Sequence, residues 1–163
     1  MASEYGLTPL LAGRNEAKLS ALSVESGYPY KVVDLDDEEG LKEMLHTAKV
    51  VLHAAGPFIE TAEKMMDACL STSTHYLDIT GEISVFEKAA ARDIAGHQAG
   101  VMIMPGVGFD VVPTDCMAAY LKNQMPNATH LKLAFAWKGG GVSRGTAKTM
   151  VLGLGHPGAI RQN

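Results

Sequence analysis

The sequence is short of cysteine, of basic charge and of long hydrophobic runs. Only 2 of the 163 residues are cysteines. They stand far apart, at Cys69 and Cys116, which excludes a disulfide scaffold or a cysteine zinc cluster. No apolar run approaches the roughly 18 residues that a membrane-spanning helix needs. The 14 Lys and Arg against 18 Asp and Glu leave a net charge of −4, which argues against nucleic acid or an anionic membrane surface as the main partner.

The remaining composition is that of a globular domain. Hydrophobic residues make up 47% of the chain, enough for a packed core, and the length favours one compact domain over two. The first residues lack the charged and apolar segments of a secretory signal. Two unpaired cysteines suit a reducing compartment, so the sequence predicts a cytoplasmic location.

Short apolar runs alternate along the chain with segments of helical periodicity. Runs this short and this apolar are typical of a parallel sheet covered on both faces. The expected strands are residues 9–12, 30–34, 50–53, 75–78, 101–104 and 131–136.

Capping residues and apolar spacing predict the helices between these strands. Asn15 caps the first and Gly27 ends it, and Asp36 or Asp37 begins the second. Ser84 and Glu87 have the spacing of a capping box. The expected inward side chains are Leu19 and Leu22; Leu41, Met44 and Leu45; Ala62, Met65, Met66, Cys69 and Leu70; Phe86, Ala89, Ala90 and Ile94; and Met117, Ala118 and Leu121 in a helix that Thr114 opens.

The alternation of strand and helix predicts an α/β fold with a doubly wound, Rossmann-like parallel sheet. The alternation changes at Pro126. After it we expect a strand and then a polar helix that begins at Ser143. We therefore expect a domain over residues 1–125 and the beginning of an α+β region over residues 126–163.

A basic residue ends the first expected strand. In a dinucleotide-binding fold, an acid at the tip of the second strand favours NAD, whereas an arginine there favours the 2′-phosphate of NADP. Arg14, followed by Asn15, is therefore a candidate contact of NADP, although a solvated turn residue is an equal alternative. Asp34 ends the next strand and could contact adenine.

Small residues follow the strand at 50–53. Ala54, Ala55 and Gly56 would let the backbone approach a cofactor closely, and Pro57 suits a first helical turn. A tight strand-to-helix turn explains the same residues, and the two interpretations are compatible.

Acidic residues gather after the later strands. Asp78 and Glu82 lie at the carboxyl end of a strand, where open α/β sheets bind ligands, but we favour a role in tying loops to helix N-termini. Asp110 and Asp115 are further acid/base candidates, and no catalytic residue is assigned. The Gly106 segment is no phosphate loop, because Val111 stands where the last glycine is needed. The six histidines show no metal-ligand spacing, so no metal site is expected.

Several of these segments occur together in one order: residues 11–19, 33–35, 54–58, 75–82 and 108–115. In this combination the chain resembles the NADP-binding Rossmann domain of the saccharopine dehydrogenase-like family, in the branch that includes trans-acting enoyl reductases. The resemblance implies an oxidoreductase that transfers hydride with NADP(H) as cofactor. It also implies that Arg14 meets the 2′-phosphate and that Ala54, Ala55 and Gly56 line the cofactor.

The chain departs from that family at both ends. The family's first strand and glycine-rich phosphate loop would precede Met1, and its second region is cut short, so we expect a truncated product. In the strand order 3-2-1-4-5-6 the missing strand is central, and its loss separates strand 9–12 from strand 50–53. Unpaired edges are costly, so either these strands pair, or a partner supplies a strand, or the chain folds poorly.

Two functions follow from this interpretation. The first is an NADP(H)-dependent oxidoreductase of weak or no activity in this form, acting on an unknown small-molecule substrate. The alternative is a non-catalytic remnant that serves as an assembly or interaction module, with homo-oligomers formed through exposed strand edges.

Overall fold

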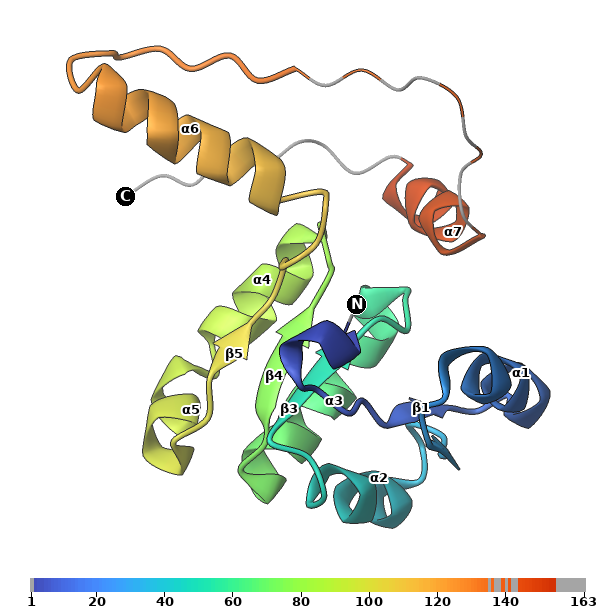
Figure 1. Ribbon diagram of the computed structural model, residues 1–163. Helices are drawn as coiled ribbons and strands as arrows, with labels where there is room; N and C mark the ends of the chain where they lie inside the picture. The colour runs from blue at the N-terminus through green and yellow to red at the C-terminus, as the bar shows by residue number, and fades with distance from the viewer. Residues whose placement is uncertain (1, 135, 137–138, 140, 142–143, 155–163) are drawn as a thin grey trace.

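The computed structural model describes residues 2–134, 136, 139, 141 and 144–154, which form an α/β fold in which helices alternate with short strands (Figure 1). Every strand pairing is parallel, as the sequence predicts. The elements are η1 (Ala2–Tyr5), β1 (Leu11–Gly13), α1 (Glu16–Ser26), β2 (Tyr30–Val32), α2 (Glu38–Leu45), β3 (Val50–His53), α3 (Phe58–Thr72), β4 (His75–Asp78), α4 (Ile83–Ala90), α5 (Asp93–Ala99), β5 (Ile103–Met104), α6 (Val112–Gln124) and α7 (Arg144–Gly153).

The strands form two separate sheets. Strand β1 pairs with β2, with Leu11 opposite Tyr30, and a second sheet has the order β3-β4-β5, with Val50 opposite His75. Within the described residues no strand pairing joins β1 to β3, so the prediction that these two strands could close up and pair is wrong for this structure. In the described part of the chain each of the two strands therefore keeps one edge without a strand beside it.

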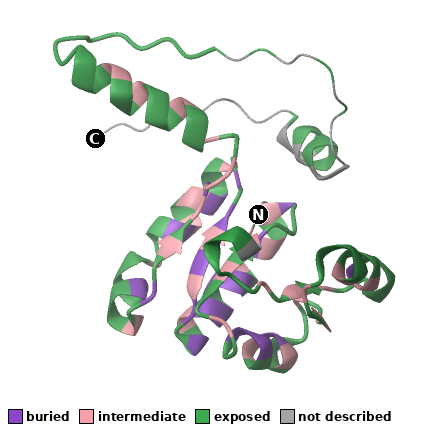
Figure 2. Ribbon diagram, viewed as in Figure 1, coloured by how far each residue is buried: buried purple, intermediate pink, exposed green. Residues whose placement is uncertain are grey.

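The core lies between β4 and the helices packed on one face of the three-stranded sheet. Tyr76, Met66 and Cys69 are fully buried there, and α2 and α4 add Leu45 and Val85. Figure 2 shows the buried residues concentrated along α3 and β4. This helix layer therefore carries most of the hydrophobic stabilisation of the described chain.

The other face of the three-stranded sheet is apolar and open. Side chains alternate between faces along a strand, so Val50, Leu52, Met102 and Met104 lie opposite the buried Tyr76. They are 42–59% exposed. Cover on both faces, expected from the apolar strands, is thus not found over this sheet in the part of the chain that the structure describes.

The caps of the first two helices are those predicted. The Asn15 side chain accepts a hydrogen bond from the Lys18 amide at 3.0 Å, and Gly27 ends α1 at a left-handed φ of 75°. The Asp37 side chain accepts from the Gly40 amide at 3.0 Å and thereby begins α2. These signals are local in sequence, which is why they could be predicted.

The start of α4 differs from the prediction. Helix α4 begins at Ile83 with Glu82 at its N-cap, so the capping box at Ser84 and Glu87 is wrong. The Thr80 hydroxyl accepts from the Glu82 amide at 3.1 Å and donates to the Glu82 carboxylate at 2.8 Å, which fixes the chain before Ser84 is reached.

Three of the side chains predicted to point inward from the helices before α6 are exposed. Leu22 on α1 is 45% exposed, and Ala90 is also exposed. Ile94 is 72% exposed, because the helix breaks at Arg92 and Ile94 belongs to α5 instead. Arg92 turns there toward Asp67, with Nε 2.7 Å from Oδ1. A tertiary ion pair has overridden the helical periodicity at this point.

The region after β5 departs furthest from the sequence prediction. Helix α6 begins at Val112 rather than at Thr114, whose hydroxyl donates to the Val111 carbonyl at 2.9 Å. No residue of α6 is buried, and Met117, predicted to point inward, is 55% exposed. Figure 1 shows α6 projecting away from the sheet. The described residues 131–134 and 136 form no strand, and Ser143 lies outside the described residues.

Candidate functional site

The candidate site lies at the carboxyl ends of the strands. Because every pairing is parallel, the loops that follow the strands of each sheet emerge at one edge. Open α/β sheets bind their ligands in the crevice at this edge. The residues that the sequence singles out follow β1, β2, β3 and β4, so the topology brings them to the carboxyl edges of the two sheets.

Arg14 stands exposed between β1 and the N-terminus of α1. Its neighbour Asn15 is occupied in capping that helix. The pKa of Asp36 is lowered mainly by the hydrogen bond and charge of Lys64, and Arg14 adds a further attraction. Arg14 therefore lies within electrostatic range of the loop after β2. Asp34, in that loop, is exposed and accepts a hydrogen bond from the Asp36 amide at 3.0 Å.

Hydrogen bonds of Thr61 hold the turn after β3. The Thr61 hydroxyl donates to the Ala55 carbonyl at 2.7 Å, so its oxygen accepts from His53 Nε2 at 3.0 Å. Burial lowers the pKa of His53, although the Asp78 carboxylate acts in the opposite direction. The imidazole is thus neutral near pH 7. In the turn that follows His53, Ala54, Ala55 and Gly56 are exposed, whereas Pro57 is buried.

Asp78 is completely buried at the end of β4 and ties two loops together. Its Oδ1 accepts from the amides of Thr80 at 3.0 Å and Gly106 at 2.8 Å, and its Oδ2 accepts from the Tyr76 hydroxyl at 2.6 Å. Burial, and then the bond to Asp78, raise the pKa of Tyr76, which stays protonated. With three donors satisfied and no exposure, Asp78 acts as a structural tie between two loops, whereas the sequence favoured a tie from loops to helix N-termini.

The other acidic candidates are spread along the same edge. Glu82 is half-buried beside Thr80. Asp110 lies next to the loop after β4, where a Cβ on Gly81 would be 3.6 Å from its Oδ2, and Asp115 is exposed in the first turn of α6.

Three contributors to the site were missed in the sequence. Lys64 reaches Asp36 across 28 residues, so no local pattern signals the contact. Thr61 acts through its turn, four residues after Pro57. Tyr76 and Asp78 could have been paired, because residues two apart share one face of a strand. Among the described residues, no group of three or more His, Cys, Asp and Glu side chains is arranged to hold a metal ion.

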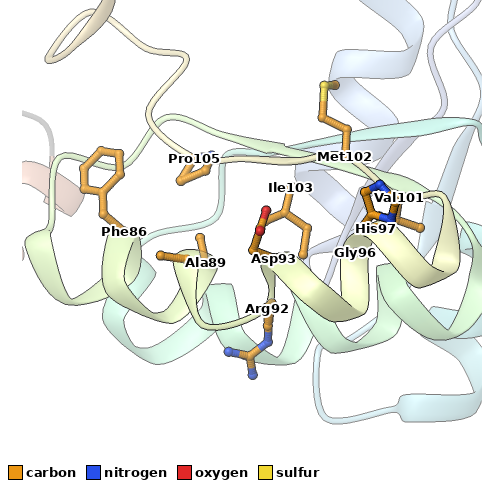
Figure 3. A pocket seen from close by; sticks show the side chains of 11 residues that line it. Phe86, Ala89, Arg92, Asp93, Gly96, His97, Val101, Met102, Ile103 and Pro105 are labelled. Carbon is orange, nitrogen blue, oxygen red and sulfur yellow. The ribbon is translucent and has the colours of Figure 1, made fainter.

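A groove of about 460 Å³ lies elsewhere, between β5 and helices α4 and α5. Figure 3 shows Phe86 and Pro105 at one end of it and His97 and Val101 at the other. None of the residues that the sequence assigns to the cofactor lines this groove, so it is separate from the candidate site.

The fold agrees with what the chain is similar to. Residues 3–104 match the family model described as the saccharopine dehydrogenase NADP binding domain. The saccharopine dehydrogenase-like oxidoreductase of Mus musculus is 30% identical over 89% of this chain and 35% of its own length. A trans-acting enoyl reductase of Mycobacterium ulcerans is 31% identical over 68% of this chain and 28% of its own length.

A solved structure shows the same fold. Saccharopine dehydrogenase (L-Glu forming) from Saccharomyces cerevisiae superposes with a TM-score of 0.64 at 19% identity, over 73% of this chain and 26% of that one. The chain thus spans well under half the length of the relatives described here. Within the described residues, no helix is long and apolar enough to cross a membrane.

These comparisons confirm three predictions made from the sequence, namely the Rossmann-like α/β class, the resemblance and NADP as the family's cofactor. The match covers the strands and loops that carry Arg14, Asp34 and the turn after β3. This chain belongs to the saccharopine dehydrogenase NADP-binding domain family.

Proposed function

We propose that this chain is the NADP(H)-binding part of a saccharopine dehydrogenase-like oxidoreductase, which transfers hydride between the cofactor and a small-molecule substrate. The observation that carries the proposal is Arg14, an exposed guanidinium between a strand's carboxyl end and a helix N-terminus, in a family of NADP-binding domains. A guanidinium forms paired hydrogen bonds with a phosphate, and a helix N-terminus favours an anion.

The residues of the site fit the two ends of NADP. In this proposal Arg14 meets the 2′-phosphate, and Asn15, whose Oδ1 caps α1, offers its side-chain amide group to the same phosphate. Asp34 contacts the adenosine. Ala54, Ala55 and Gly56 are exposed and carry little or no side chain, so the backbone there can lie against a flat ligand. Pro57 is buried and supports this turn from its helix side.

The pyrophosphate is the part of the cofactor that these residues do not cover. A glycine-rich loop leading into a helix normally supplies its amide donors. No such loop lies beside β1 or β3 in the described part of the chain. We therefore propose that this chain binds NADP(H) weakly on its own.

The chain's own residues bind and orient, whereas the bound cofactor supplies or accepts the hydride. Arg14 provides charge at the adenosine end. Thr61 and His53 hold the turn after β3, and Asp78 holds the loops after β4 and β5. His53 and Tyr76 remain neutral near pH 7, so they add no charge beneath the site.

Titration of the purified chain with NADPH and NADH, followed by nicotinamide fluorescence, tests this proposal. We expect NADPH to bind more tightly than NADH, because only NADPH carries the 2′-phosphate that Arg14 would meet. Equal affinity for the two cofactors, or no binding of either, would count against it.

A second candidate function is that of an assembly module, and the separated sheets favour it. Strands β1 and β3 each keep an edge with no strand beside it, and the apolar face around Leu52 is open. Such edges and faces are templates for association. Light scattering across a concentration series tests this, and a strict monomer at high concentration would contradict it.

A matched pair of variants sharpens the test of association. Leu52→Lys places a charge on the open sheet face, where Leu52 is 59% exposed, and Val24→Lys does so on α1, where Val24 is 86% exposed. Association through the sheet predicts that only Leu52→Lys shifts the chain toward monomer. Equal effects of both substitutions would indicate nonspecific hydrophobic contact instead.

The cytoplasmic location remains a proposal. The support for it is chemical, since Cys69 and Cys116 are both free thiols. Cell fractionation with an antibody to the chain would test it, and recovery in a membrane-bound organelle would contradict it.

A further inference from the structure

A layer of fully buried polar groups lies beneath the carboxyl edge of the three-stranded sheet. Tyr76 and Asp78 are 0% exposed and Thr80 is 1% exposed. All three take part in the hydrogen bonds of the Asp78 carboxylate. The Val107 amide adds a bond to the Asp78 carbonyl at 2.7 Å. One residue thus receives amide donors from the loop after β4 and from the loop after β5.

The loop after β5 also packs closely against α4 and against the loop after β4. Gly106 has a φ of +76°, and a Cβ built on it would lie 2.7 Å from Cζ of Phe86. A Cβ on Gly108 would lie 2.7 Å from Cβ of Ile79, in the loop after β4. The loop after β5 therefore has little freedom to shift while its amides remain bonded to Asp78.

These loops belong to the half of the fold that would face the reactive end of the cofactor. A Rossmann fold has two mononucleotide-binding halves, and the dinucleotide lies across both at the carboxyl edge. Arg14 follows β1, in the half proposed to hold the adenosine end. The loops after β4 and β5 lie in the other half, which leaves them the nicotinamide end.

We propose that Asp78 is a positioning residue that holds the loops after β4 and β5 in register for the nicotinamide end of NADP(H), without touching the cofactor itself. The inference rests on the proposed function, since it needs an NADP(H) site at this edge. It assigns the two residues to different ends of the cofactor: Arg14 binds the adenosine end, and Asp78 positions the loops at the nicotinamide end.

The geometry calls for a hydrogen-bond acceptor rather than for a charge. Both loop amides donate to the same oxygen, Oδ1. An asparagine can present this oxygen unchanged, and its amide group can donate to the Tyr76 oxygen in place of the bond that Oδ2 accepts. A leucine of similar size presents no acceptor. Asp78→Asn should therefore preserve the loops and Asp78→Leu should release them.

The experiment compares two ligands on each variant, NADPH and adenosine 2′,5′-bisphosphate, which has the 2′-phosphate but lacks the nicotinamide. Affinities are measured by NADPH fluorescence and by displacement calorimetry. In Asp78→Leu we expect NADPH affinity to fall about tenfold while the affinity for the bisphosphate stays within about twofold. In Asp78→Asn we expect both affinities to match those of the parent chain.

Gly106→Ala keeps the inference testable if Asp78→Leu does not fold. The added methyl group collides with Phe86 of α4 and displaces the same loop, while Asp78 is unchanged. Gly100→Ala is the matched control, because Gly100 also has a positive φ, of 65°, but has no atom within 4 Å of its Cβ position. We expect only Gly106→Ala to lower NADPH affinity selectively.

The outcomes separate the inference from the function on which it rests. If the parent chain binds neither ligand, the proposed function is overturned, and the inference with it. If the parent binds both, but Asp78→Leu and Gly106→Ala weaken both ligands equally or neither, the inference alone is overturned. Failure of Asp78→Asn to retain NADPH affinity would also overturn it, because the acceptor oxygen would then not be sufficient.

Discussion

Replacing Arg14 by glutamine is the most direct perturbation of the proposed cofactor site. The substitution removes a positive charge but keeps a polar side chain of moderate length in an exposed position, so the fold should not change. Glutamine cannot form the paired, charge-assisted hydrogen bonds that a guanidinium forms with a phosphate. The loss should therefore fall on NADPH and spare NADH.

The expected magnitude follows from where Arg14 lies. A hydrogen bond to a charged group contributes about 1.5–3 kcal/mol, and exposure to solvent places Arg14 at the lower end of that range. Part of the gain is offset because phosphate must compete with the Asp36 carboxylate, toward which Arg14 is already attracted. A net loss of about 1–2 kcal/mol corresponds to a fall in NADPH affinity of about 5- to 30-fold.

The assay is fluorescence titration of NADPH and NADH at low ionic strength, on the parent chain, Arg14→Gln and Lys49→Gln. Lys49 is exposed at the amino end of β3, so its substitution removes the same charge at the opposite edge. The difference between the parent and Arg14→Gln should shrink at about 1 M salt, where screening acts over about 3 Å. An unchanged ratio of NADPH to NADH affinity in Arg14→Gln would refute the reasoning.

Three further predictions concern the core beneath the site. Thr74→Val removes a fully buried hydroxyl that donates to the Leu45 carbonyl at 3.0 Å, so thermal unfolding should show a loss of about 1–2 kcal/mol, or about 2–8 °C, while Thr8→Val on the surface shows none. Burial raises the pKa of Cys69 to about 12, so at pH 8 a thiol reagent should react rapidly with the exposed Cys116 alone, and two fast thiols would contradict this. The pKa of His53 is lowered from 6.5, so the unfolded chain binds the proton first and stability is lost as the pH falls below about 6.5. Between pH 7.5 and 5.5 the free energy of unfolding, measured in urea, should fall less in His53→Gln than in the parent chain. An equal fall in both proteins would contradict the assignment to His53.

Local signals allowed much of the fold to be predicted. The caps at Asn15 and Asp37 depend on bonds to residues three positions away, and Gly27 supplies the left-handed conformation that ends α1. The apolar spacing from Ala62 to Cys69 identifies the buried side of α3. Each feature is decided by a short stretch of chain, and so each can be read before any tertiary contact is known.

The features that the sequence did not reveal depend on distant contacts. The spacing of Ser84 and Glu87 fits a capping box, but hydrogen bonds between Thr80 and Glu82 fix the chain earlier, and α4 begins at Ile83. Asp78 ties two loops together because it accepts a hydrogen bond from the Gly106 amide, 28 residues away. Helix α6 has an apolar pattern, yet burial requires a partner surface, and none in the described chain covers it. Within the candidate site, residue types predicted the carboxyl edge of the sheet, whereas the hydrogen bonds beneath that edge join residues distant in sequence and so could not be predicted.

The connection between the two sheets has a mechanical consequence. The β1–β2 unit is joined to the rest of the fold through α2, which follows β2 in the chain and packs on α3 with Leu41 and Leu45 buried. Two ion pairs add to this connection, Lys31 with Glu43 and Asp36 with Lys64. Packed helices can slide by small steps, whereas a continuous hydrogen-bonded ladder resists such shear. If the chain binds NADP(H) as proposed, the separation between the Arg14 and Asp78 ends of the site would therefore be adjustable, and ligands of different span would draw the two halves together to different extents.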